Sequence, residues 1–482
     1  MTMKRIAIIG GGISGLSAAF RLEEARAAGA PLDYVLYESS PRLGGVLVTE
    51  RENGCLIEAG PDSFISEKPW AADLCRQLGL GDQLIGSNDS ERKTYILVKG
   101  KLVVIPDGLM FMVPTKILPA VFSPLFSVAT KLRMAREWFH PPRKAEVDET
   151  VASLVERHYG AEMVDRLADP LLSGVYGGEA GELSVRAVLP RFAEMEANYG
   201  SLGRAMLAAR KKMAQASKGP ARPLFTSLKD GMQQMVDALL KRLPAACMRP
   251  GTPVQAAQPQ ESGWMISAGH GHGSEQFDAV IVATPSQTAA ELLRLADKEL
   301  ASELLGIAYS SSVTVTLAYD QTVQSTLPPG FGFLVPRSEG KRMLAATFVH
   351  NKFPHRAPED RALVRCFLGG SRDEKILQLS EDEILQIVRR ELRQIIGLSA
   401  EPLFSRVYKW KAAMAQYSVG HLERLQRIER LVQKLPGLAL AGNGYRGIGV
   451  PDCVRSGREA ANQSLLATGL NETAPAAVRL PG

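Results

Sequence analysis

Four glycines near the N-terminus and one later carboxylate have the types and spacing that bind a dinucleotide. Residues 10–15 read GGGISG, so Gly10, Gly12 and Gly15 follow the G-x-G-x-x-G pattern. Glycines at this spacing allow a tight turn, let the backbone approach a pyrophosphate and let a helix pack closely on a strand. Glu38 follows Gly15 by 23 residues, where such sites place a carboxylate for the ribose hydroxyls. The residues therefore predict a dinucleotide cofactor.

The residues around these glycines predict a strand, a turn and a helix, in that order. The segment 5–9 is short, apolar and rich in β-branched residues, as expected of a strand buried on both faces, and 16–22 has helix-forming composition. The N-terminus of that helix would offer unpaired N–H groups to phosphates. A second apolar strand at 34–38 completes a βαβ unit. A purely structural βαβ unit is the alternative.

The residues that follow Glu38 favour FAD over NAD. The stretch ESSPRLGG, residues 38–45, places Arg42 and a glycine pair directly after the carboxylate. The stretch EAGPDS, residues 58–63, is a second turn in which the backbone can come close to a cofactor. A tightly held FAD needs more backbone contact than NAD, and Arg42 supplies a charge for phosphate. A surface arginine beside a plain turn is the alternative. These stretches resemble those of the FAD-dependent amine-oxidase superfamily.

Composition indicates a globular protein of more than one domain. The 482 residues, 45% apolar and 22% charged, are too many for one compact core. The five cysteines are scattered without a C-x-x-C pair, so neither a metal site nor a disulfide framework is expected. Because the first strand begins within a few residues, no signal peptide is expected either, which favours a cytoplasmic location. The net charge is +6, but the basic residues are scattered and form no stripe interleaved with aromatic residues. Nucleic acid is therefore not an expected partner.

One apolar segment, residues 102–129, is interrupted by prolines and followed by cations. It contains no uninterrupted apolar run long enough to span a bilayer. An apolar surface beside Lys131, Arg133 and Arg136 fits peripheral contact with the cytoplasmic face of a membrane. An ordinary buried pair of helices is the alternative.

The order of the expected elements predicts an α/β protein with a discontinuous Rossmann-like FAD-binding domain, a mixed-sheet substrate domain and a mostly helical, membrane-facing subdomain. The FAD-binding domain takes residues 1–90, 222–290 and 436–470. The helical subdomain takes residues 91–221, the substrate domain takes 291–435, and 471–482 form a flexible tail. The sequence leaves a homodimer open.

Three later stretches are more specific than the glycine turns: SGVYGG at 173–178, FGFLVP at 331–336 and GNGYRGIGVPDC at 442–453. Together with the N-terminal stretches they resemble, over essentially the full length, the oxygen-dependent protoporphyrinogen oxidase family, including its coproporphyrinogen-oxidising branch. The resemblance implies oxidation of protoporphyrinogen IX in heme biosynthesis, with six electrons passing through FAD to three O₂ and giving H₂O₂. Coproporphyrinogen III is the alternative substrate, and a carrier protein of this fold without redox activity is the alternative of another class.

The resemblance and the glycine turns together imply a set of binding residues. For FAD these are Gly10, Gly12, Ile13, Ser14, Gly15, Glu38, Ser39, Arg42, Gly44, Gly45, Val46, Gly60, Pro61, Asp62, Ser63, Val254, Trp410, Ile448, Gly449 and Val450. No acid–base residue is assigned, because the flavin carries the chemistry.

For the porphyrinogen, the resemblance implies Gly174 on one side of the ligand, with Leu334 and Phe348 gripping the macrocycle. Thr94 stands where many family members carry an arginine that pairs with a substrate propionate. A threonine cannot form a bidentate charged pair, so Arg92 or Lys93 are the alternative anchors.

Overall fold

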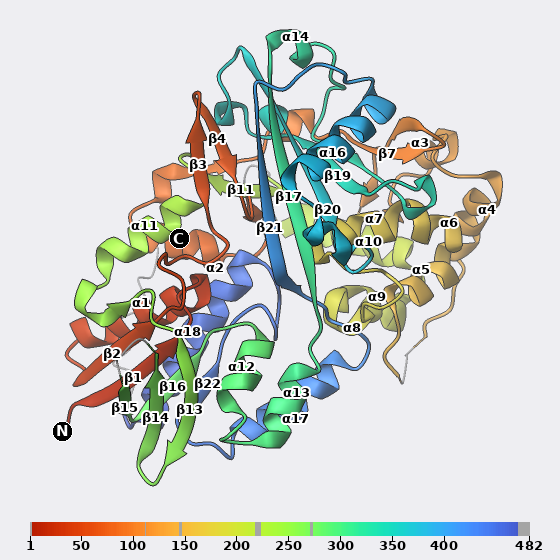
Figure 1. Cartoon of the computed structure of the whole chain (residues 1–482). Helices are drawn as coiled ribbons and strands as arrows, with labels where there is room; N and C mark the ends of the chain where they lie inside the picture. Colours follow the sequence, from red (N-terminus) through yellow and green to blue (C-terminus); the bar gives the residue numbers. More distant parts are fainter. Residues whose placement is uncertain (1, 111, 144–146, 217–222, 270–272, 471–482) are drawn as a thin grey trace.

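Two sheets and the helices packed on them organise the chain, as Figure 1 shows. The computed structural model describes residues 2–110, 112–143, 147–216, 223–269 and 273–470. The expected tail at 471–482 lies outside the described residues.

The first sheet is parallel and draws its strands from distant parts of the chain. Its order is β12 (Met248–Arg249), β2 (Leu32–Tyr37), β1 (Lys4–Ile9), β16 (Ala279–Val282) and β22 (Leu438–Leu440), with every neighbouring pair parallel. Strands from the beginning, middle and end of the sequence thus form one Rossmann-like sheet. Ligands of such sheets bind outside the carboxyl ends of the strands.

Both faces of the parallel sheet are covered, which explains why its strands are apolar throughout. Ile6 and Ile8 face one hydrophobic cluster, whereas Ala7 and Ile9 face another. The first cluster contains residues of α1 (Ile13–Ala27), α2 (Trp70–Gln77), α11 (Gln233–Arg242) and α18 (Val450–Ala467). The second contains residues of β13 (Val254–Gln260), β14 (Gly263–Ala268), β15 (Gly273–Phe277), α12 (Ser286–Leu293), α13 (Lys298–Leu305) and α17 (His421–Val432).

The second sheet is mixed, as the sequence predicted. Its order is β21 (Phe404–Ala415), β17 (Tyr309–Asp320), β20 (Arg361–Gly369), β19 (Met343–Phe348), β18 (Gly332–Leu334), β7 (Thr94–Val98) and β8 (Lys101–Val104). The β18–β7 pair is parallel and the others are antiparallel. The helix α16 (Glu381–Ile396), which begins with a capping box of Ser380 and Glu383, packs its buried residues with one face of this sheet.

Residues 94–104 correct one expected boundary. They were assigned to the helical subdomain, but they form β7 and β8 of the mixed sheet. The helical region follows them and comprises α3 (Ile117–Phe122), α4 (Val128–Glu137), α5 (Val151–Tyr159), α6 (Ala161–Met163), α7 (Asp169–Tyr176), α8 (Val185–Val188), α9 (Pro190–Tyr199) and α10 (Leu202–Ala216). Within the described ranges, none of the helices has both the length and the hydropathy to cross a membrane.

Smaller elements connect the two sheets. A hairpin of β3 (Thr49–Glu52) and β4 (Cys55–Glu58) leads toward the predicted cofactor loop at 60–63. A three-stranded sheet joins β5 (Phe64–Ile65), β11 (Phe225–Leu228) and β6 (Leu84–Gly86). The short helix α15 (Val349–Lys352) follows β19 directly.

A buried histidine on α5 contacts carboxylates of two other helices in the helical region, α4 and α9. The Nδ1 atom of His158 lies 3.2 Å from Glu137 Oε1, and its Nε2 atom lies 3.1 Å from Glu196 Oε1. Ionised carboxylates only accept hydrogen bonds, so two such partners favour the doubly protonated ring. Burial by itself lowers the pKa of His158, but the hydrogen bonds to Glu137 and Glu196 outweigh it and raise the pKa above its ordinary value of 6.5.

This arrangement predicts a stability contribution that is lost at alkaline pH. Because the folded-state pKa of His158 is raised, the contribution is fully present below the unfolded value of 6.5 and disappears as the pH rises through the folded value. Replacing His158 with glutamine removes the cationic partner of the buried Glu137, whereas Glu196 keeps its ion pair with Arg157. We therefore expect a loss of about 3 kcal/mol at pH 6 and a smaller loss at pH 9. Thermal or urea unfolding at each pH measures both.

The test compares the free energies of unfolding of the wild type and His158→Gln at each pH. Burial lowers the pKa of the other shifted histidines, which gives them the opposite pH dependence; these are His140, His350, His355 and His421. If this difference in free energy stays constant or grows between pH 6 and pH 9, His158 is not protonated in the folded protein.

Candidate functional site

The glycine turn between β1 and α1 lies at the carboxyl edge of the parallel sheet and leaves room for a ligand. Gly10 has a φ of 108°, and a Cβ atom on Gly15 would lie 1.8 Å from the Gly10 carbonyl oxygen. A Cβ atom on Gly12, by contrast, would meet no atom within 4 Å. Gly12 is also the N-cap of α1, and no side chain caps this end. Open space thus faces a helix N-terminus, as an anionic phosphate requires.

Glu38 lies beside this turn, where the sequence placed it. Its Oε2 atom accepts a hydrogen bond of 2.7 Å from the Gly11 N–H, and its Oε1 atom accepts one of 2.7 Å from the Ser40 N–H. The carboxylate therefore stands at the end of β2, next to the first glycine turn. The next predicted residue, Ser39, is exposed.

Arg42 organises the second glycine turn. Its Nη1 atom donates to the carbonyls of Leu43 at 2.8 Å and Leu47 at 3.2 Å, and its Nη2 atom donates to the carbonyl of Gly45. A Cβ atom on Gly45 would lie 3.1 Å from the Gly12 Cα atom, so the two glycine turns touch. The structure brings these predicted residues together.

The loop that carries Gly60 is fastened to the mixed sheet. The carbonyl oxygen of Ala59 accepts hydrogen bonds of 2.9 Å from Thr314 Oγ1 on β17 and of 2.9 Å from Trp410 Nε1 on β21. The guanidinium of Arg365 on β20 donates to the Gly60 carbonyl. Trp410, predicted to contact the cofactor, therefore holds the backbone of the predicted cofactor loop in this structure.

The C-terminal glycine stretch supplies a second helix N-terminus at the same edge. Ile448 and Gly449 lead into α18, whose N-cap Gly449 has no side-chain cap. Because α1 and α18 follow the carboxyl ends of strands in one parallel sheet, their N-termini meet at one edge. The two helices pack closely, since a Cβ atom on Gly457 would lie 2.0 Å from the Ser14 carbonyl oxygen.

These features fit the cofactor that the motifs predicted. An open space at a glycine turn, a carboxylate beside it and two uncapped helix N-termini suit a long, anionic dinucleotide such as FAD. Most of the remaining predicted residues lie in the same turns: Ile13 and Ser14 in the first turn of α1, Gly44 and Val46 beside Gly45, Pro61 to Ser63 after Gly60, and Val450 at the start of α18. Val254 lies outside them, at the start of β13.

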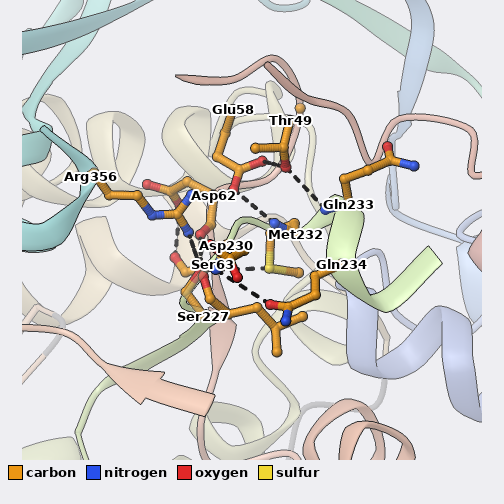
Figure 2. A network of polar contacts seen from close by, with 12 residues as sticks. Thr49, Glu58, Asp62, Ser63, Ser227, Asp230, Met232, Gln233, Gln234 and Arg356 are labelled. Atoms are coloured by element: carbon orange, nitrogen blue, oxygen red, sulfur yellow. Dashed lines mark hydrogen bonds and ion pairs between the residues drawn. The ribbon is translucent and has the colours of Figure 1, made fainter. Parts of the chain in front are cut away.

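A buried charge network underlies the cofactor loop, and Figure 2 shows its side chains converging from several elements. Glu58 Oε1 accepts hydrogen bonds from Arg356 and from the Met232 N–H, and Glu58 Oε2 accepts one of 2.8 Å from Thr49 Oγ1. Both side chains of the Glu58–Arg356 pair are almost fully buried. Nothing in the spacing of the sequence signalled Arg356, because it lies 298 residues beyond Glu58.

Asp62 belongs to the same network and stays ionised. Its carboxylate lies 3.0 Å from the Lys352 ammonium and accepts a hydrogen bond of 2.7 Å from Ser63. Burial alone would raise the pKa of Asp62, but the charges of Lys352 and Arg365 hold that pKa well below its ordinary value. The loop from Gly60 to Ser63 is thus fixed by charges on both sides.

The prediction that Leu334 and Phe348 grip one ligand is wrong. Phe348 is fully buried, its ring centroid lies 6.2 Å from that of Phe333, and both belong to the cluster beneath α16. Leu334 follows Phe333 in β18 and packs with the helical region instead. Successive residues of a strand point to opposite faces, so Leu334 and Phe348 lie on opposite sides of the sheet.

Phe367 is an aromatic side chain on the same face as Leu334, and the sequence reasoning missed it. Leu334 pairs with Ala345, and Ala345 pairs with Phe367, so the three side chains share one face. The period of two in β20, which alternates Arg365 and Phe367 with fully buried residues, was the available signal. Knowing the face required the register of β19.

Thr94 and Gly174 lie near this face. Thr94 pairs with Gly332 and is two residues from Ile96, the partner of Leu334, so Thr94 also shares the face of Leu334. Gly174 is exposed on α7, which contacts β18 and β19, and a Cβ atom there would meet no atom within 4 Å. Leu334 and Thr94 therefore share one face of the sheet, the helix that carries Gly174 contacts its strands, and Phe348 points to the other face.

Comparisons with known proteins agree with this geometry. The family model described as flavin containing amine oxidoreductase matches residues 13–465. The coproporphyrinogen III oxidase of Bacillus subtilis (strain 168) is 34% identical, over 96% of this chain and 98% of that protein. Protoporphyrinogen oxidase 2 of Arabidopsis thaliana is 28% identical, over 95% of this chain and 93% of that protein. The crystal structure of a putative protoporphyrinogen oxidase from Exiguobacterium sp. 255-15 superposes with a TM-score of 0.86 at 32% identity, covering 97% and 99% of the two chains.

Proposed function

The chain belongs to the flavin containing amine oxidoreductase family and is a FAD-dependent oxidase, and from that premise we propose that it oxidises coproporphyrinogen III in heme biosynthesis. The sequence motifs alone favoured protoporphyrinogen IX. The observation that carries the proposal is the full-length identity of 34% to a coproporphyrinogen III oxidase. Protoporphyrinogen IX is the second candidate, because a relative named for that activity is 28% identical.

The residues of the chain divide the work of such a reaction between them. When bound, FAD would take hydride from the bridging methylenes and pass electrons to O₂, so that the six electrons of one porphyrinogen reduce three O₂ to three H₂O₂. Glu38 would hold the ribose hydroxyls, and the N-termini of α1 and α18 would stabilise negative charge on the cofactor. Leu334 and Phe367 supply apolar and aromatic walls suited to a large macrocycle.

A substrate panel tests the proposal. The purified FAD-bound protein is supplied with coproporphyrinogen III, protoporphyrinogen IX and a primary amine, and porphyrin fluorescence and H₂O₂ are followed. We expect the fastest turnover with coproporphyrinogen III and none with the amine. Faster oxidation of protoporphyrinogen IX would identify it as the preferred substrate instead. Oxidation of the amine alone would contradict both.

Gly174 offers a test of where the substrate lies. Its position on α7 faces open space, so Gly174→Leu fits the fold but fills that space. We expect a KM about tenfold higher with an unchanged FAD content, because a side chain of this size displaces part of a bound macrocycle. Gly174→Ala removes a helix-interior glycine and should raise the free energy of unfolding by about 0.5–1 kcal/mol.

A matched control is available nearby. Gly181 is also exposed, and a Cβ atom there also meets no atom within 4 Å, but it lies in a turn after α7. Gly181→Leu should change neither KM nor FAD content. Equal effects of the two leucine variants would mean that Gly174 does not border the substrate.

The exposed apolar side chains of α3, of α4 and of Phe139, which follows α4, support peripheral contact with an anionic membrane. Phe122 is 81% exposed and Phe139 is 84% exposed, and Leu118, Val128 and Leu132 are also exposed. The two helices lie at the same end of the molecule in Figure 1. Lys131, Arg133 and Arg136 on α4 complement anionic headgroups. The apolar side chains and the cations together match the chemistry of an anionic lipid surface.

Sedimentation with vesicles checks this contact. We expect binding to vesicles that contain an anionic phospholipid, weaker binding to purely zwitterionic vesicles, and loss of about 10-fold in affinity for the double variant Phe122→Ser, Phe139→Ser. Binding of the double variant at wild-type strength contradicts the assignment of this surface.

A further inference from the structure

A buried carboxylate lies at the N-terminus of α18, one of the two helix ends at the cofactor edge of the parallel sheet. Asp452 belongs to the first turn of this helix and is 4% exposed. A Cβ atom on Gly447 would lie 2.3 Å from Asp452 Cγ, and one on Gly449 would lie 3.3 Å from Asp452 Oδ2. Because Gly449 is among the residues predicted to contact FAD, this negative charge stands beside the cofactor site.

The charge of Asp452 has two opposing effects at this helix end. An acidic side chain in the first turn interacts favourably with the helix dipole and stabilises α18. Two-electron reduction adds negative charge to the flavin, however, and a bare carboxylate nearby opposes that change. A cation paired with Asp452 would remove the conflict.

Lys68 supplies that cation from the segment that follows the cofactor loop. Its Nζ atom lies 2.6 Å from Asp452 Oδ2 and donates a hydrogen bond to it. Lys68 comes shortly after Ser63, the last residue of the loop that begins at Gly60. The ion pair therefore joins two segments that were predicted to contact FAD, the loop and the N-terminus of α18.

Arg455 is a weaker partner for the same carboxylate. Its Nη2 atom lies 3.8 Å from Asp452 Oδ1, beyond hydrogen-bond distance. That nitrogen donates a hydrogen bond of 2.7 Å to the Arg446 carbonyl instead, and the Nη1 atom lies 3.3 Å from Glu459. Lys68 is therefore the cation that decides the charge at this helix end.

The charge of Asp452 also acts on the helix beside the substrate surface. Burial, together with the smaller effect of the Asp452 charge, raises the pKa of Tyr176 to about 12. Tyr176 is the last residue of α7, the helix that carries Gly174. The Lys68–Asp452 pair thus lies near both the cofactor edge and the helix next to the substrate surface, where the reacting end of the cofactor belongs.

We propose that Lys68 raises the reduction potential of the bound FAD by neutralising Asp452 at the N-terminus of α18. Lys68 is a positioning residue in this scheme, because it acts through Asp452 and not on the reacting atoms. With the carboxylate neutralised, the partial positive charge of the helix end favours the reduced flavin. The inference rests on FAD as the cofactor and not on the identity of the porphyrinogen, because the potential is measured without substrate.

The reduction potential of the FAD-bound protein, measured anaerobically against a reference dye, tests this role. Lys68→Met leaves Asp452 without its cation, so the equilibrium constant for two-electron reduction should fall about tenfold, which lowers the potential by about 30 mV. Asp452→Asn leaves Lys68 without its anion and should change the potential by a similar amount in the opposite direction. The double variant has the same net charge as the wild type and should return to the wild-type potential.

Lys4→Met is the matched control. Lys4 and Asp278 form an ion pair of the same type, with 2.9 Å between nitrogen and oxygen, but at the amino ends of β1 and β16. Because ligands bind at the opposite, carboxyl edge of the sheet, Lys4→Met should leave the potential unchanged.

Three results would overturn the proposal. One is a wild-type potential in Lys68→Met, and another is a double variant that keeps the potential of Lys68→Met. The third is a shift in Lys4→Met as large as that in Lys68→Met. If Lys68→Met retained no FAD, Asp452→Asn would decide alone, because a potential that stays at or below the wild-type value contradicts the charge effect.

Discussion

Gly12→Leu should yield a folded but colourless protein that retains no FAD. The backbone at Gly12 has a φ of −71°, which any residue adopts, and a Cβ atom there would meet no protein atom within 4 Å. The added leucine instead occupies the space at the N-terminus of α1 where the phosphates belong. We expect at least about a 100-fold loss of FAD affinity, measured by flavin fluorescence titration, because the steric overlap cannot be relieved without moving the cofactor.

Circular dichroism and the unfolding midpoint serve as the check on folding for this variant. Both should match the FAD-free wild type. Gly181→Leu, the same change at an exposed glycine outside the cofactor turns, should retain stoichiometric FAD. A yellow Gly12→Leu protein with one FAD per chain would falsify the placement of the cofactor.

Arg356→Met should be the most destabilising single change in the network of Figure 2. It leaves the carboxylate of Glu58 buried without its charged partner, since both side chains of the pair are at most 4% exposed. Breaking such a pair costs about 3–5 kcal/mol. Urea unfolding measures the loss, and FAD content should fall with it because the network supports the cofactor loop.

The pH dependence and a second substitution separate this cause from a simple loss of packing. Burial already raises the pKa of Glu58, and removal of Arg356 raises it further. A raised carboxyl pKa favours the folded state at low pH, so the deficit of Arg356→Met should grow as the pH rises from 5 to 8. Adding Glu58→Gln removes the buried charge and should recover about half of the loss. A pH-independent deficit that Glu58→Gln does not relieve contradicts the charge explanation.

The cofactor turn could be predicted because its signals are local. Gly10, Gly12 and Gly15 lie within one turn, and the strands on either side are continuous apolar runs. The carboxylate of Glu38 ends the adjacent strand, so its place followed from the βαβ order. The structure adds the physical reason for each glycine: a positive φ at Gly10, a close approach at Gly15 and open space at Gly12.

The substrate face could not be predicted, because it depends on pairing between distant strands. Leu334 and Phe348 are both apolar and lie in neighbouring strands, yet they point to opposite faces. Only the register that aligns Leu334 with Ala345 and Phe367 identifies the shared face. The same limit applies to residues 94–104, whose sheet partner β18 lies more than 200 residues later in the chain.

The buried charges were beyond sequence reasoning for a related reason. Glu58 and Arg356 are 298 residues apart, and each is an ordinary charged residue in its local context. Their significance comes from burial, which removes the water that would otherwise screen them. Arg365 shows this best, since its hydrogen bonds to the carbonyls of Ala59 and Gly60 and the effect of its charge on Asp62 emerge only when the whole fold surrounds it.

Anaerobic reduction of the bound flavin tests the central claim most directly. The FAD-bound protein is mixed without oxygen with coproporphyrinogen III, and the absorbance band of the oxidised flavin is followed. The account predicts that the band disappears, that it returns when O₂ is admitted, and that coproporphyrin accumulates. A band that persists with coproporphyrinogen III and with protoporphyrinogen IX, or that disappears only with an amine, would contradict it.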